Sequence, residues 1–116
     1  DPYLKVLPRC FAAGDVACAR LDGEVLRLSV QFAIAGGACA AGNIMREIAG
    51  RPLHSFRPVD PGFIIPMANN RSIGKAAGLP VRGGPATLLH YVMCSFRSQC
   101  VRTGYGVIRD LLKARH

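Results

Sequence analysis

A glycine followed by an aspartate near the start of the chain is the pair of residues best suited to chemistry. An apolar run, Cys10–Ala13, leads directly into Gly14-Asp15. Glycine lets a ligand approach the backbone closely, and the aspartate beside it offers an anionic hydrogen-bond acceptor. Because open α/β sheets bind ligands at the turns after strands, the pair predicts one wall of a nucleotide-cofactor site. A plain turn is the alternative interpretation of Asp15, since Gly-Asp is common in turns.

Other kinds of site have little support in the sequence. The five cysteines include no Cys-x-x-Cys pair, so neither a zinc ribbon nor a thioredoxin-like motif is indicated. The three histidines do not stand at metal-ligand spacing. No Gly-x-Gly-x-x-Gly occurs, so a dinucleotide's diphosphate has no binding loop here. We therefore predict no metal site and no catalytic side chain in this chain.

The composition suits a piece of protein that packs against other protein. Half of the residues are hydrophobic and 19% are charged, below the usual fraction of about 25%. The net charge of +8 lies mostly in the second half of the chain. Such a half could face anionic lipid, an acidic partner or nucleic acid, and a solvated basic surface is the simplest interpretation. Because Trp is absent and aromatic residues are few, we expect no nucleic-acid partner.

The elements around Gly14-Asp15 follow from apolar spacing and from turn residues. Short extended segments are predicted at 3–6 and 9–13, with a polar loop at 18–24. A long helix is predicted from 25 to 49, because Gly50 and a following proline suit a helix end. Small residues recur within it every four positions, which indicates close approach of another element or of a flat ligand. Its long uncharged stretch predicts a buried helix rather than a membrane span.

The remainder of the sequence predicts a small sheet followed by helices. Between residues 55 and 82, glycines and prolines typical of turns separate short apolar runs. This pattern favours three antiparallel strands near 54–59, 62–68 and 71–77. Helices are predicted at 85–98 and 106–115, each with an apolar stripe. We take these stripes as part of the domain's own core, with an external interface as the alternative. The fold class is therefore α+β, with a long helix, a small antiparallel sheet of about three strands and C-terminal helices.

Several stretches, in order along the chain, resemble one family of flavoproteins. Residues 1–6 and 11–15 resemble the second FAD-contacting motif of the pyridine nucleotide-disulfide oxidoreductase superfamily. Residues 30–33 and 41–44 are similar to a helix of the type II NADH dehydrogenases in that superfamily. The stretch 83–91 is similar to the start of their carboxyl-terminal helix.

This resemblance implies a set of roles. Gly14 and Asp15 would contact the flavin, with the Asp15 carboxylate on a ribityl hydroxyl. Val30 and Gln31 would lie near the flavin ring, although a helix-surface amide is the alternative for Gln31. FAD would be the cofactor of the longer parent protein and NAD(P)H its co-substrate. Because Ala35-Gly36 stands where these enzymes often carry a second polar residue, the electron acceptor stays open between a quinone and another compound.

The resemblance also implies an organisation into domains. Residues 1–24 would hold the last strand region and the Gly-Asp motif of an FAD-binding domain, and residues 25–116 the long helix and an interface domain. We expect the FAD and NAD(P)H domains to lie upstream in a longer protein, which forms a homo-oligomer in the cytoplasm or peripherally on the membrane's cytoplasmic face. Alternatives are a non-catalytic dimerisation or membrane-surface module, and a relative in the same superfamily with another substrate, such as a disulfide or a sulfide.

Overall fold

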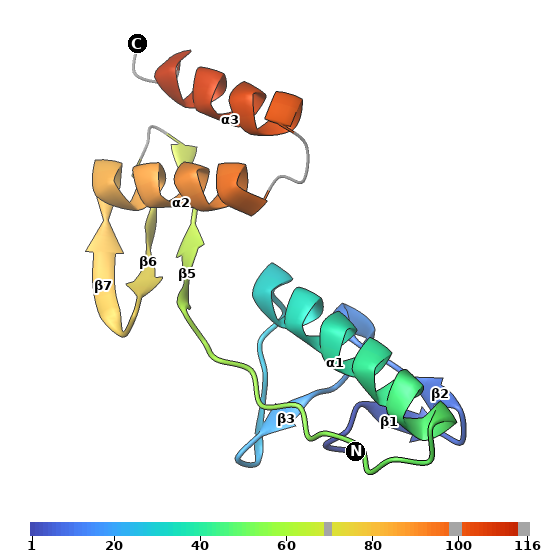
Figure 1. Ribbon diagram of the computed structural model, residues 1–116. Helices are drawn as coiled ribbons and strands as arrows, with labels where there is room; N and C mark the ends of the chain where they lie inside the picture. Colours follow the sequence, from blue (N-terminus) through green and yellow to red (C-terminus); the bar gives the residue numbers. More distant parts are fainter. Residues whose placement is uncertain (69–70, 98–100, 114–116) are drawn as a thin grey trace. The chain divides into compact units, whose positions relative to one another are not determined.

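The computed structural model describes residues 1–68, 71–97 and 101–113. Contacts divide the chain into two compact units, Asp1–Asp60 and Pro61–His116. Figure 1 shows the first unit in blue to green and the second in yellow to red. Both units combine helix with short antiparallel strands, so the predicted α+β class is confirmed. The assignment of 1–24 and 25–116 to domains of a parent protein stays a prediction.

The first unit surrounds one long helix with two small hairpins. It contains β1 (Lys5–Leu7) paired with β2 (Cys10–Phe11), and β3 (Arg20–Leu21) paired with β4 (Glu24–Val25). The short 3-10 helix η1 (Gly14–Val16) separates the hairpins. The predicted loop at 18–24 is therefore a hairpin, and the predicted extended segments are shorter than expected.

Helix α1 runs over Val30–Ile48, not over 25–49 as predicted. It starts late because Val25 belongs to β4 and Ser29 has extended backbone angles. The Ser29 Oγ accepts a hydrogen bond from the Phe32 backbone N–H at 3.3 Å, which is an N-cap. The capping serine thus fixes where α1 begins.

The core of the first unit lies between α1, the segment before β1 and the segment after α1. Leu4, Ala40 and Phe56 form its buried cluster, and Phe32 is also buried. Asn43 is buried among these groups at 1% exposure. The strand predicted at 54–59 is wrong, since that segment pairs with no strand. Its backbone at His54 is bonded instead to the Asn43 side chain.

The second unit is a three-stranded sheet covered on one face. Strands β5 (Gly62–Ile65), β6 (Ile73–Ala76) and β7 (Leu79–Arg82) pair antiparallel in that order. Helix α2 (Gly83–Arg97) packs on the sheet, and α3 (Val101–Lys113) packs on α2 (Figure 1). The prediction of three strands is confirmed in number, but it missed β7.

The two C-terminal helices present apolar side chains outward within their own unit. On α2 the buried residues are Ala86 and Thr87, whereas Phe96 is 86% exposed. Leu88, Val92, Ile108 and Leu112 are also exposed. These stripes are therefore not the core that the sequence suggested. Within the described ranges, no helix has both the length and the apolarity to cross a membrane.

Candidate functional site

The Gly14-Asp15 pair lies on η1, which packs against the first turns of α1. Gly14 has a φ of +74°, a conformation that L-residues with a side chain adopt at a cost. A β-carbon at Gly14 would lie 3.4 Å from the Ala33 Cβ, and one at Gly36 would lie 3.4 Å from the Ala13 Cβ. The close approach predicted from the small residues of α1 is thus found at Ala33 and Gly36, but not at Gly37 or Gly42.

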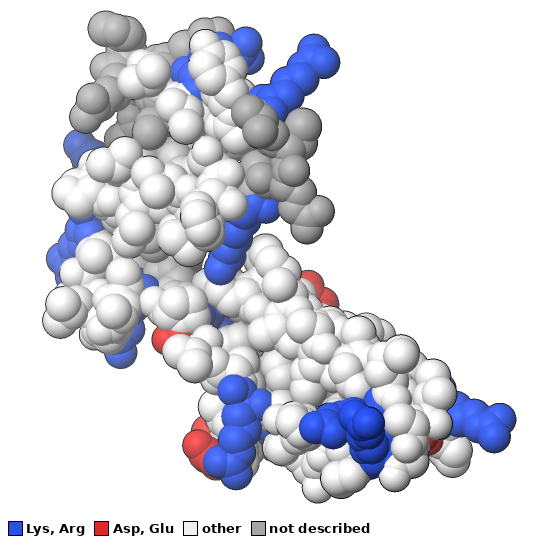
Figure 2. All heavy atoms as spheres, viewed as in Figure 1, with Lys and Arg blue, Asp and Glu red and all other residues white. Residues whose placement is uncertain are grey.

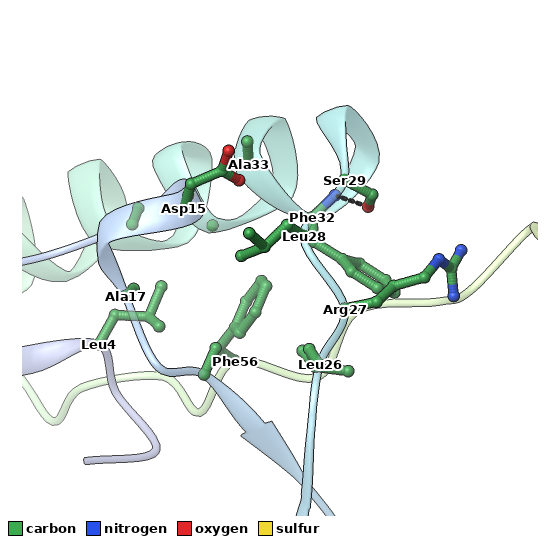
Figure 3. A pocket seen from close by; sticks show the side chains of 14 residues that line it. Leu4, Asp15, Ala17, Leu26, Arg27, Leu28, Ser29, Phe32, Ala33 and Phe56 are labelled. Carbon is green, nitrogen blue, oxygen red and sulfur yellow. Dashed lines mark hydrogen bonds between the residues drawn. The ribbon is translucent and has the colours of Figure 1, made fainter. Parts of the chain in front are cut away.

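A small cavity lies beneath this contact (Figure 3). Its volume of about 20 Å³ is room for roughly one water molecule. It is lined by Leu4, Ala13, Gly14, Asp15, Ala17, Ala19, Leu26, Arg27, Leu28, Ser29, Phe32, Ala33, Gly36 and Phe56. A flavin ring is too large to enter this cavity. A flavin would therefore lie on the outer surface of the Gly14-Asp15 turn.

Two of the four predicted site residues line this cavity, and two do not. Gly14 and Asp15 are among the lining residues, whereas Val30 and Gln31 are not. Val30 is 61% exposed at the first position of α1. Their roles toward a flavin stay predictions.

The Asp15 carboxylate is available for a ligand. The side chain is exposed and makes no hydrogen bond or ion pair with any residue that the structure describes. Figure 3 shows Asp15 beside Ala33, in the first turn of α1. The first backbone N–H groups of a helix have no carbonyl partner inside the helix and carry partial positive charge. Asp15 is therefore an exposed anionic acceptor near the start of α1.

An ion pair missed by the sequence analysis supports the loop that precedes α1. Arg27 forms a two-pronged ion pair with Asp60, in which Nη2 lies 2.6 Å from Oδ1. The hydrogen bond to Asp60 raises the pKa of Arg27. The Arg27 guanidinium also lies 5.1 Å from the centre of the Phe32 ring. The ion pair thus connects Asp60, the last residue of the first unit, to Arg27, which lines the small cavity.

A second and larger cavity, here called the basic groove, lies on another face of α1. It has a volume of about 350 Å³. It is lined by Ala35, Ala38, Cys39, Gly42, Asn43, Arg46, His54, Ser55, Phe56, Arg57 and Pro58. The sequence analysis missed this groove because its polar residues share no motif. They come together only because the segment after α1 turns back along the helix.

Burial in the basic groove raises the pKa of the Cys39 thiol. At a given pH, Cys39 therefore holds a smaller fraction of thiolate, which is the reactive form. We expect iodoacetamide at pH 8 to alkylate Cys39 more slowly than the exposed Cys10 and Cys18, with the lag shrinking as pH rises. Peptide mass spectrometry over a time course measures the three rates. Equal rates at pH 8 would contradict the burial argument.

The described part of the chain contains no group of three metal-ligating side chains. The sequence had led to the expectation of no metal site.

Comparison with known proteins gives a partial relationship. No family model matches the chain. Over 60 residues the chain is 42% identical to an "NADH dehydrogenase-like protein" of Mycobacterium tuberculosis, in each of two strains of that organism. The match covers 49% of this chain and 15% of each relative, so the chain spans a small fraction of the curated relatives that it matches. The resemblance to NADH dehydrogenases is thus supported in part, as a relationship to NADH dehydrogenase-like proteins over about half of this chain.

Proposed function

We propose that this chain is the carboxyl-terminal portion of an FAD-dependent NAD(P)H dehydrogenase. The observation that carries the proposal is the 42% identity to an NADH dehydrogenase-like protein, in a chain that also holds a Gly-Asp turn against a helix start. The parent would pass electrons from NAD(P)H through FAD to a quinone or another acceptor. The isolated chain would be inactive, because the diphosphate-binding loop would lie upstream.

The residues around Asp15 fit the ribityl end of a flavin. Its carboxylate is exposed and bonded to no described residue, so it can accept hydrogen bonds from sugar-alcohol hydroxyls. Gly14 keeps the turn within van der Waals distance of α1. The positive end of the α1 dipole would favour the electron-rich edge of a flavin ring. When bound, the flavin supplies hydride acceptance and one-electron transfer, and the protein supplies binding and orientation.

The outward face of α1 supports a position inside a larger protein. Residues on the side away from the core are all uncharged and largely exposed: Val30, Ile34, Gly37, Ala41, Ile44, Met45 and Ile48. A large exposed apolar surface of this kind marks a place where other protein packs. Apart from its chain neighbours and the adjoining backbone of α1, no described atom lies within 4 Å of a β-carbon built at Gly37. We infer that the upstream FAD and NAD(P)H domains cover this face.

Binding of riboflavin to the chain tests the flavin proposal. Riboflavin carries the ring and the ribityl chain but no phosphate, so its contacts would be those assigned to this chain. We expect weak, saturable binding, with chemical-shift changes in the amides of Gly14, Asp15, Val30 and Gln31 in a ¹⁵N NMR titration. In Asp15→Asn the binding is expected to weaken at least about fivefold, since a hydrogen bond to a charged group is worth about 1.5–3 kcal/mol.

The matched control is Asp22→Asn, which removes the same charge from an exposed turn in the β3–β4 hairpin. It should bind riboflavin as the parent chain does. The proposal would be wrong if no amide near Asp15 shifted at saturation, or if both variants lost affinity equally.

A second function is favoured by the exposed apolar residues of α2 and α3. Phe96 is 86% exposed and Leu112 is 60% exposed, and clusters of exposed apolar residues mark interaction surfaces. In this alternative the second unit mediates dimerisation or contact with a membrane surface. Homo-oligomerisation would be common to both proposals, and sedimentation of the chain at several concentrations measures it.

A further inference from the structure

The basic groove is a built cavity with a rigid polar frame. The Asn43 side chain donates to the carbonyl oxygens of Tyr3 and His54 at 2.9 Å, and its Oδ1 accepts from the His54 N–H at 2.8 Å. Asn43 is 1% exposed, so these bonds are shielded from water. They hold the segment that carries Arg57 at a fixed place beside α1.

The polar side chains that line the groove include two arginines and carry no negative charge. Arg46 contacts the His54 ring at Nε2. Arg57 is exposed and makes no ion pair with a described residue. The groove is thus lined by two guanidinium groups and an imidazole, with the Ser55 side chain also among its lining residues.

No described carboxylate is among the residues that line the groove. The two acidic residues of the first unit closest in sequence to the groove are both engaged elsewhere. Glu47 pairs with Lys5 at 2.8 Å, and Asp60 pairs with Arg27. On the face of the molecule shown in Figure 2, acidic side chains are few beside the basic ones. An anion entering the groove would meet no compensating negative group among its lining residues.

The size and walls of the groove fit a small organic molecule. Its volume of about 350 Å³ lies within the usual range for small-ligand sites, about 300–1,000 Å³. Its apolar lining residues are Ala35, Ala38 and Gly42 from α1, together with Phe56 and Pro58 from the segment after α1. A ligand with a short carbon skeleton could rest on these residues while its charged end meets the arginines. Arginine pairs are suited to oxyanions because each guanidinium can bond two oxygens.

From this geometry we propose that the basic groove binds a small organic oxyanion, either a phosphate ester or a dicarboxylate. The site is separate from the surface around Asp15, since Asp15 does not line it. It is independent of the flavin proposal.

Calorimetric titration of the whole chain in a buffer free of phosphate tests the proposal. The probes are inorganic pyrophosphate and malonate, and a preference for one of them identifies the head group. We expect saturable binding of at least one probe, weaker as salt is added. Because Cys39 lines the groove, the bound probe should also slow its alkylation at least about twofold, while Cys10 and Cys18 react as before.

Substitutions locate the binding. The Arg57 side chain makes no ion pair with another described residue. Arg57→Gln should therefore weaken binding at least about tenfold, the usual scale for the loss of a charge-assisted hydrogen bond. Arg46→Gln should do the same, with circular dichroism confirming that it folds. The control is Arg51→Gln, which removes the same charge from an exposed residue outside the groove. The absence of saturable binding, or equal losses in Arg57→Gln and Arg51→Gln, would overturn the proposal.

Discussion

Replacing Asn43 by alanine is expected to destabilise the first unit by about 3 kcal/mol or more. The change leaves the carbonyl oxygens of Tyr3 and His54 and the N–H of His54 without their partner. Each buried polar group left unsatisfied costs about 1–3 kcal/mol. Alanine is itself the best helix former, so helix propensity opposes the loss. For a domain of this size the melting temperature should fall by roughly 10–20 °C.

Circular dichroism during heating measures this effect, and amide hydrogen exchange at His54 localises it. Asn43→Asp is nearly the same size but loses both donated bonds, so it should destabilise at least as much as the alanine variant. The control is Met45→Ala, in the same helix, where the side chain is 65% exposed and little should change. A melting temperature for Asn43→Ala within 2 °C of the parent, roughly the shift from a surface substitution, would refute the prediction.

The sequence predicted the fold class because the apolar spacing of the helices and the glycine and proline spacing around the strands extend over enough residues to be recognised. The start of α1 was misplaced because the hairpin of β3 and β4 has two residues in each strand, too few to show alternation. The strand predicted at 54–59 failed for another reason. Phe56 does point inward, whereas Val59 is exposed, and the backbone at His54 bonds to Asn43 rather than to a neighbouring strand.

The two candidate sites differ in how far the sequence could find them. Gly14-Asp15 is a pair of adjacent residues, so its chemistry is visible without a structure. The basic groove joins Arg46, His54 and Arg57 from two segments, and the turn after α1 decides whether they meet. Asn43 belongs to a stretch that resembles a family motif, but the resemblance did not indicate that its side chain fixes the groove. Side-chain bonds to a distant backbone have no periodic signature in a sequence.

Adding a single methyl group at Gly74 is expected to disrupt the sheet of the second unit. A β-carbon there would lie 2.1 Å from the Phe63 carbonyl oxygen and 2.8 Å from the Ile64 Cα. These are backbone atoms of β5, the strand paired with β6, so no rotamer change can relieve the clash. The two strands would have to separate, which breaks their hydrogen bonds and moves Ile64. We expect Gly74→Ala to cost at least about 3 kcal/mol, the upper end for overpacking.

Glycine 84 provides the matched control in the same unit. It lies in the first turn of α2, and nothing lies within 4 Å of a β-carbon built there. Gly84→Ala should therefore leave the sheet intact and stabilise the unit by up to about 1 kcal/mol, the helix preference for alanine. Thermal unfolding compares the two variants, and amide NMR signals from β5 and β6 report the strand pairing. If Gly74→Ala kept those NMR signals and had the same melting temperature as Gly84→Ala, the close spacing of β5 and β6 would be wrong. The opposite effects follow from one added carbon, because Gly74, unlike Gly84, lies against the backbone of a neighbouring strand.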